Sequence, residues 1–241
     1  MIMNHHLFNK DTLNIFTDGS IKKFYINCEE ETIGCAGANI VVTDEIGIHS
    51  IEAATEITRN TTNNDTEIRS ILLGVQRALY YRELYPFKYI NIIADSKICI
   101  YGLREWIFSW INNTDPSGKI MISSQGTPVA NQQVILQIIY TILQNNLNIN
   151  FYHQNGHKNC NNMKDMKAAK EAFIKSNYIS CDVDMELIKN ISIANDYVDK
   201  FTKQELDRFI PDRIIRPNIY MNYIYKPFDA DRYNELIRGY K

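Results

Sequence analysis

The stretch NIFTDGS, residues 14–20, places a carboxylate at the end of a short apolar run. The alternation and the β-forming residues of LNIFTD, residues 13–18, predict a strand, and Gly19 is typical of a turn at its end. Many strands end in an Asp-Gly turn with no functional meaning. Asp18 therefore indicates a site only if distant parts of the chain supply chemical partners for it.

The rest of the chain predicts an α/β protein. We expect further strands at 34–43, 47–58, 89–96 and 147–153, and helices at 67–84, 102–111, 130–146, 163–176 and 194–209. This order predicts a five-stranded mixed sheet, in which a three-stranded antiparallel meander is joined by parallel strands and flanked by helices.

Composition sets limits on the class of protein. The chain has 241 residues, 45% of them hydrophobic and 22% charged, as in a soluble globular protein with a sizeable core. The net charge of −2 excludes strong attraction of the whole surface to nucleic acid, so a polyanion site must come from local clustering or metal ions. We find no membrane span or signal peptide and expect a cytoplasmic protein, or one in the host cytoplasm or nucleus if its source is viral.

Two acids end predicted strands, Asp18 after the first and Asp95 after the strand at 89–96. If those strands are neighbours, their carboxylates lie close together, and Mg²⁺ or Mn²⁺ relieves the repulsion. Glu67 falls in the first turn of the helix at 67–84, where it either reaches the same point or forms a capping box with Asn64. Asp199, one turn into the last helix, is by itself typical of a solvated acid.

Six segments in order resemble ribonuclease H of type 1. They are IFTDGS (15–20), TTNNDTEI (61–68), ADSKICIYGLREWIFSW (94–110), GTPVANQ (126–132), NGH (155–157) and ANDYVDKF (194–201). The resemblance implies the ribonuclease H-like fold and an enzyme that cuts the RNA strand of RNA–DNA hybrids.

The resemblance also implies the catalytic residues. Asp18, Glu67, Asp95 and Asp199 match the family's carboxylates, and His157 matches the histidine of its loop. Four acids without a nucleophilic side chain fit a mechanism with two Mg²⁺ or Mn²⁺ ions, giving 5′-phosphate and 3′-hydroxyl ends. We expect His157 to take part in proton transfer or product release.

Residues near these acids are candidates for binding the substrate. We expect Gly19 and Ser20 to let the RNA backbone come close, and Asn63 and Asn64 to face the minor-groove side of the RNA strand. Alternatively, Asn63 and Asn64 are polar residues of a helix N-terminus and do not bind the substrate.

Three further residues match family positions on the DNA strand. Thr62 and Asn131 match positions that hold a DNA phosphate, and Trp110 matches the aromatic residue that packs on a DNA sugar. Trp106 is expected in the core.

The chain departs from the family in three places. The loop after Trp110 holds only Lys119, where many family members carry a lysine-rich protrusion. We divide the chain into a lead (1–12), the ribonuclease H domain (13–205) with an insertion at about 158–194, and a Tyr-rich extension (206–241). The insertion helix either replaces the protrusion or is a solvated helix that packs through Met166 and Phe173; its segment carries Lys158, Lys164, Lys167, Lys170 and Lys175.

The predicted function is a divalent-metal-dependent endonuclease that hydrolyses the RNA of RNA–DNA hybrids, in the removal of primers or stray hybrids. The alternatives are a catalytically altered hybrid-binding module and another nuclease of the same fold, such as a resolvase or an integrase. We expect a monomer, with the extension packed as extra helix or contacting nucleic acid or a replication partner.

Overall fold

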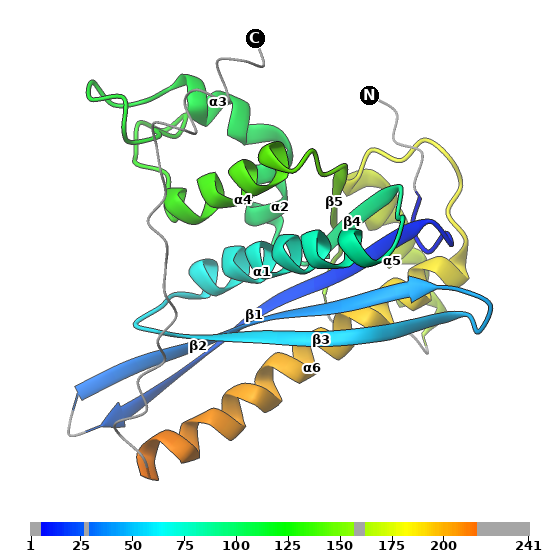
Figure 1. Ribbon diagram of the computed structural model, residues 1–241, viewed down its shortest axis with the longest axis horizontal. Coiled ribbons are helices and arrows are strands. Elements are labelled where there is room, and N and C mark those ends of the chain that lie inside the picture. The colour runs from blue at the N-terminus through cyan, green and yellow to red at the C-terminus, as the bar shows by residue number, and fades with distance from the viewer. Residues whose placement is uncertain (1–5, 27–28, 157–161, 216–241) are drawn as a thin grey trace.

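Strand β1 (Thr12–Ile26) is the central strand of a five-stranded sheet with the order β3-β2-β1-β4-β5 (Figure 1). It pairs antiparallel with β2 (Glu29–Thr43), which in turn pairs antiparallel with β3 (Ile48–Arg59). On its other side β1 pairs parallel with β4 (Tyr89–Ala94), and β4 pairs parallel with β5 (Ile149–His153). The predicted meander with added parallel strands is confirmed.

The computed structural model describes residues 6–26, 29–156 and 162–215. His157 and residues 216–241 of the predicted extension lie outside this range. Among the described residues, no helix has both the length and the apolar character needed to cross a bilayer. The helices are α1 (Asn63–Leu84), α2 (Lys97–Tyr101), the π-helix η1 (Gly102–Trp106), α3 (Ile107–Asn112), α4 (Gln132–Gln144), α5 (Met163–Ser176) and α6 (Met185–Ile215).

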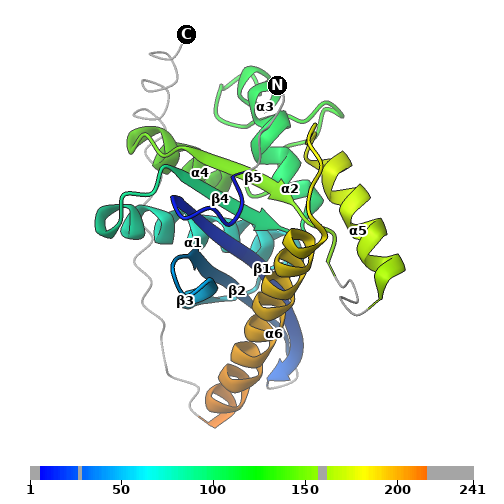
Figure 2. The ribbon, with the colours of Figure 1, turned by 90° about the vertical axis from the view of Figure 1, so that its right-hand side faces the viewer.

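Helices cover both faces of the sheet. Helix α1 lies on one face with α4 packed on it, and α6 crosses the other face beside β1 and β2 (Figure 2). Leu13 and Ile15 of β1 belong to the core cluster under α1, whereas Phe16 belongs to the cluster under α6. The first half of β1 is therefore buried on both faces, and its polar residues Thr12, Asn14 and Thr17 are buried together with its apolar ones.

The strand hairpin and the last helix are longer than the sequence predicted. Strands β1 and β2 continue past the predicted ends to a hairpin of two 15-residue strands. Helix α6 begins at Met185, nine residues before the predicted start at 194, and runs without a break to Ile215. The added first turns bury Ile188 and Ile191 at the spacing that Val198 continues, so this signal was present in the sequence.

The prediction that Trp106 lies in the core is wrong. Its exposed fraction is 40%, and its ring packs edge-on against Trp110 with the centroids 5.9 Å apart. Trp106 ends the π-helix η1, whose i→i+5 hydrogen bonds rotate the residues that follow relative to those before. A face assigned with the ordinary helical period is therefore not maintained across this segment.

The insertion is attached to the sheet through Asn177, which follows α5 and is fully buried. Its side chain accepts a hydrogen bond from the His153 backbone N–H at 2.8 Å and donates one to the His153 carbonyl at 2.8 Å. It also accepts from Arg104 Nη1 at 3.1 Å. Since β5 is an edge strand of the sheet, Asn177 satisfies backbone groups that the edge leaves unpaired.

Helix α5 packs through Met166 and Phe173, as one of its two interpretations predicted, because both side chains are buried in the cluster under α6. Lys164, Lys167 and Lys175 are exposed, and Lys170 pairs with Asp182 at 2.7 Å.

Replacing Asn177 with Ala is expected to destabilise the protein. Removing the side chain takes the partner of the buried His153 backbone N–H and one partner each from the His153 carbonyl and Arg104, at a cost of about 1–3 kcal/mol for a group left unsatisfied. We expect a loss of about 2–4 kcal/mol in the free energy of unfolding, measured by urea denaturation. The control is Asn112→Ala, which removes an exposed bond to the Phe108 carbonyl and should change little. Equal effects of the two substitutions contradict the edge-capping role.

Candidate active site

The two strand-terminal acids lie where β1 and β4 separate. The parallel pairing of these strands ends at Thr17 and Ala94, and the next residue on each strand is Asp18 or Asp95. Glu67 reaches the same place from α1. One carboxylate oxygen from each of the three acids lies within 4.8 Å of the others. The structure thus brings three of the four predicted acids into one tight cluster.

Gly19 permits this close approach of α1 to β1. A Cβ atom at Gly19 would lie 2.6 Å from the backbone nitrogen of Glu67 and 2.6 Å from the carbonyl carbon of Thr66. No other residue fits without moving the helix away from the strand. The small residue after Asp18 therefore does more than form a turn, because it sets the distance between Asp18 and Glu67.

The capping-box interpretation of Glu67 is wrong. Helix α1 begins four residues earlier than predicted, with Thr62 as its N-cap, and the Thr62 hydroxyl accepts a hydrogen bond from the Asp65 backbone N–H at 3.2 Å. Asp65 thus occupies the capping position, and Glu67 lies in the second turn, buried against the sheet. Its carboxylate takes no part in the helix cap and can therefore join the acidic cluster.

Burial and mutual repulsion perturb both buried acids. Burial, followed by the charges of Asp95 and Asp199, raises the pKa of Asp18 to about 7. Burial, followed by the charge of Asp18, raises the pKa of Glu67 to about 9. Such shifts are typical of functional sites, since a purely structural role gives no reason to bury two acids beside a third.

Asp199 joins the cluster from α6. It is half-buried, lines the same groove as the three other acids, and raises the pKa of Asp18 through its charge. The groove has a volume of about 550 Å³ and continues along β1 and α6 past Ser20. Lys203, one turn after Asp199, pairs with it at 2.5 Å. Sequence reasoning missed Lys203, although its i,i+4 spacing from Asp199 is a usual signal for such a pair.

The acidic cluster fits a divalent cation. Oxygen-only donors suit Mg²⁺ and Mn²⁺, and carboxylates that repel one another gain most from a bound cation. Among the described residues, Oε2 of Glu67 is buried and has no hydrogen-bond partner. A buried carboxylate oxygen without a partner is costly unless a cation binds it.

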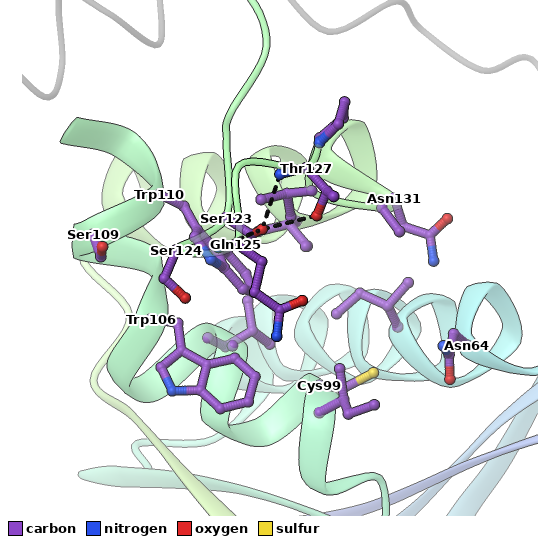
Figure 3. A pocket seen from close by; sticks show the side chains of 18 residues that line it. Asn64, Cys99, Trp106, Ser109, Trp110, Ser123, Ser124, Gln125, Thr127 and Asn131 are labelled. Atoms are coloured by element: carbon purple, nitrogen blue, oxygen red, sulfur yellow. Dashed lines mark hydrogen bonds between the residues drawn. The ribbon is translucent and has the colours of Figure 1, made fainter. Parts of the chain in front are cut away.

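A second hollow lies on the other side of the α1 N-terminus, which we call the aromatic pocket. It has a volume of about 500 Å³, and none of the described residues that line it is charged. Figure 3 shows Trp106 and Gln125 on one side of it, with Asn64 and Asn131 on the other. Trp110 also lines this pocket.

The predicted substrate residues therefore separate into two groups. Gly19, Ser20 and Asn63 line the acidic groove, whereas Asn64, Trp110 and Asn131 line the aromatic pocket. Thr62 is exposed at the start of α1.

The predicted histidine, His157, lies outside the described residues. Gly156, directly before it, packs against the acidic cluster, since a Cβ there would lie 2.5 Å from Oδ2 of Asp95. A different histidine, His153, was not anticipated. It is buried at the end of β5, and its Nε2 lies 3.1 Å from the Asp95 carbonyl oxygen. Burial lowers the pKa of His153, so the ring is neutral near pH 7 and supports the Asp95 backbone as a hydrogen-bond donor.

Fold and site together define an α/β protein with an acidic, cation-accepting centre at the edge where two strands separate. The chain belongs to the RNase H family, whose model matches residues 10–173. The match ends within α5, so the assignment of Asp199 to the site comes from the structure. A comparison with curated proteins finds no match.

Solved structures give weaker likenesses. The prototype foamy virus protease-reverse transcriptase has a TM-score of 0.49 and 16% identity, covering 74% of this chain. This chain spans about a fifth (22%) of the viral chain. RNase H1 from the archaeon Halobacterium salinarum has a TM-score of 0.38 and 14% identity, covering 59% of this chain and 86% of that one. LC11-RNase H1 in complex with an RNA/DNA hybrid has a TM-score of 0.40 and 16% identity, covering 68% of this chain and 98% of that one.

Metal-free protein is expected to lose stability as the pH rises. With the pKa of Glu67 raised to about 9, the native state binds more protons than the unfolded chain between the ordinary carboxyl value of 4.5 and that value. The free energy of unfolding must then fall with rising pH across this window. We expect Tm in EDTA to fall between about pH 6 and about pH 9, measured by calorimetry.

Glu67→Gln should flatten this dependence because it removes the group that releases a proton on unfolding. Glu186→Gln, which changes an exposed acid in α6, serves as the control and should keep the wild-type slope. A wild-type slope in Glu67→Gln contradicts the assignment.

Proposed function

We propose that the protein is an endonuclease that hydrolyses the RNA strand of RNA–DNA hybrids, leaving 5′-phosphate and 3′-hydroxyl ends, with two Mg²⁺ or Mn²⁺ ions at the acidic cluster. The family assignment supports the hybrid as substrate. The cluster of Asp18, Glu67 and Asp95, with Asp199 beside it, supports the metal ions. When bound, such ions supply activation of the attacking water and stabilisation of the leaving 3′-oxygen.

In this proposal each acid holds part of the metal site from a different element. Asp18 is our candidate for the ligand shared by both ions, since it belongs to the tight cluster with Glu67 and Asp95 and its pKa also responds to the charge of Asp199. Neighbouring charges and burial make the cluster unfavourable when empty, which favours binding of cations. His157 is proposed to move a proton, and the residue before it in the sequence, Gly156, packs against Asp95.

The observation that carries the proposal is the position of the α1 N-terminus between two unlike hollows. Asn63 lines the acidic groove and Asn64 lines the aromatic pocket. We propose that the RNA strand lies along the groove, where Gly19 and Ser20 leave its backbone room. The DNA strand would lie over the aromatic pocket, with a sugar on Trp110 and phosphate contacts from Thr62 and Asn131. A duplex with one strand of each kind fits this pair of sites.

Asp95→Asn is expected to reduce cleavage of a labelled RNA–DNA hybrid by about 100-fold or more, because it removes a metal ligand. The assay measures initial rates with Mg²⁺ on the hybrid, on duplex RNA and on duplex DNA. The control is Asp196→Asn, an acid on α6 outside the groove. Full activity in Asp95→Asn would falsify the proposed site. Cleavage of duplex DNA by the wild type would favour a resolvase or an integrase, and hybrid binding without cleavage would favour a binding module.

The aromatic pocket has, among the described residues, no charged lining residue that could attract phosphates, so positive charge must come from other parts of the chain. We propose that the exposed lysines of α5 contribute it. Changing Lys164, Lys167 and Lys175 together to Glu should weaken hybrid binding and reduce its salt dependence, by up to about 0.9 in slope for each phosphate that a lysine no longer neutralises. Fluorescence anisotropy at several salt concentrations measures both. The control is Lys88→Glu, which changes a lysine 71% exposed beside the start of β4. Unchanged binding in the α5 variant restricts α5 to a structural role.

A further inference from the structure

Thr202 of α6 is fully buried and lies within reach of three oxygen atoms at the active site. Its hydroxyl oxygen is 3.1 Å from Ser20 Oγ and 3.4 Å from Asp18 Oδ2. It is also 2.9 Å from the backbone carbonyl oxygen of Asp199, one turn earlier in the helix. A single side chain thus contacts both β1 and α6 at the point where they supply acids to the cluster.

The shape of threonine matches this position because of Gly37. In the register of β1 and β2, Gly37 lies directly opposite Asp18. A Cβ at Gly37 would lie 2.2 Å from the Thr202 methyl carbon, so the methyl group occupies the space that the glycine leaves free. This packing lets α6 come close enough to the sheet for the hydroxyl group to reach β1.

The hydroxyl group has one proton to donate and two lone pairs that can accept. The Asp199 carbonyl and the ionised Asp18 carboxylate can only accept, so they compete for the Thr202 proton. Ser20 can donate its own proton to Thr202 at the same time. A hydrogen bond to a carboxylate is charge-assisted and stronger than one to a carbonyl group, so Asp18 Oδ2 is a competent acceptor for the Thr202 proton.

We propose that Thr202 is a positioning residue that holds Asp18 in the orientation in which it binds a divalent cation. Residues that bond to metal-binding carboxylates orient them, and their loss typically lowers metal affinity about 10–100-fold. This inference rests on the proposed function only in that the acidic cluster binds divalent ions. None of the six sequence segments that resemble ribonuclease H contains Thr202, which directly follows the last of them.

The test is Mn²⁺ binding to the full-length protein without substrate, measured by isothermal titration calorimetry. Thr202→Val keeps the methyl group that packs on Gly37 but removes the hydroxyl, and we expect its Kd for Mn²⁺ to rise about 10-fold. Thr202→Ser keeps the hydroxyl and should bind Mn²⁺ close to the wild-type level. Thr12→Val is the matched control, because Thr12 is equally buried on β1, far along the strand, and its Oγ1 has no partner among the described residues.

Wild-type Mn²⁺ affinity in Thr202→Val overturns the inference, and so does a Thr202→Ser variant as weak as Thr202→Val, since packing would then explain the loss. If Thr202→Val does not fold, Ser20→Ala replaces it. This variant removes the Ser20 hydroxyl that bonds to Thr202 and leaves the packing of α6 intact. We expect its Kd for Mn²⁺ to rise as well. A wild type that binds no Mn²⁺ overturns the proposed function as well. A wild type that binds Mn²⁺ and cleaves hybrid, with Thr202→Val equal to it in affinity, overturns this inference alone.

Discussion

The close approach of two helices to one strand is the constraint on which the site depends. Helix α1 reaches β1 over Gly19, and α6 reaches the sheet over Gly37, from opposite faces. Together they exclude water from Asp18 and Glu67, which are 4% and 7% exposed. Burial without a cation is unfavourable for both acids, as their raised pKa values express. The fold thus holds two carboxylates in positions that are unfavourable until a divalent ion binds them.

Packing elsewhere in the structure must offset the unfavourable burial of these two acids. The strands on either side of the site are buried on both faces, and the core clusters under α1 and α6 supply the apolar contact that holds the helices in place. The insertion adds to this framework at the open edge of the sheet. Asn177 binds the backbone of β5, and Arg104 joins the end of α5 to the π-helix, with Nη2 2.8 Å from the Ser176 carbonyl oxygen. A segment that looks like an addition in the sequence is therefore part of the fold around His153 and Asp95.

Much of the fold follows from local patterns, because strand alternation, helical periodicity and strand-terminal acids depend on neighbours in the sequence. The mixed sheet and the meeting of Asp18 with Asp95 were predicted on that basis and agree with the structure. The misplaced features depend on tertiary contacts or on irregular geometry. Trp106 was assigned to the core because a π-turn has no reliable sequence signal. Thr202 was missed because its partners, Ser20 and Gly37, lie far away in the sequence.

The two hollows beside the α1 N-terminus differ in chemistry, and the charge of their lining residues alone does not explain how they would bind a nucleic acid. The acidic groove repels phosphates unless cations occupy it, and the aromatic pocket has no described lining residue of either charge. A nucleic acid gains little from either hollow by simple attraction of opposite charges. Binding would then depend on metal ions at the groove and on stacking and hydrogen bonding at the pocket, both of which act at short range. Such contacts respond to sugar identity and groove shape, whereas a basic surface attracts any polyanion. The weak overall charge of the protein is thus consistent with selection of one kind of duplex.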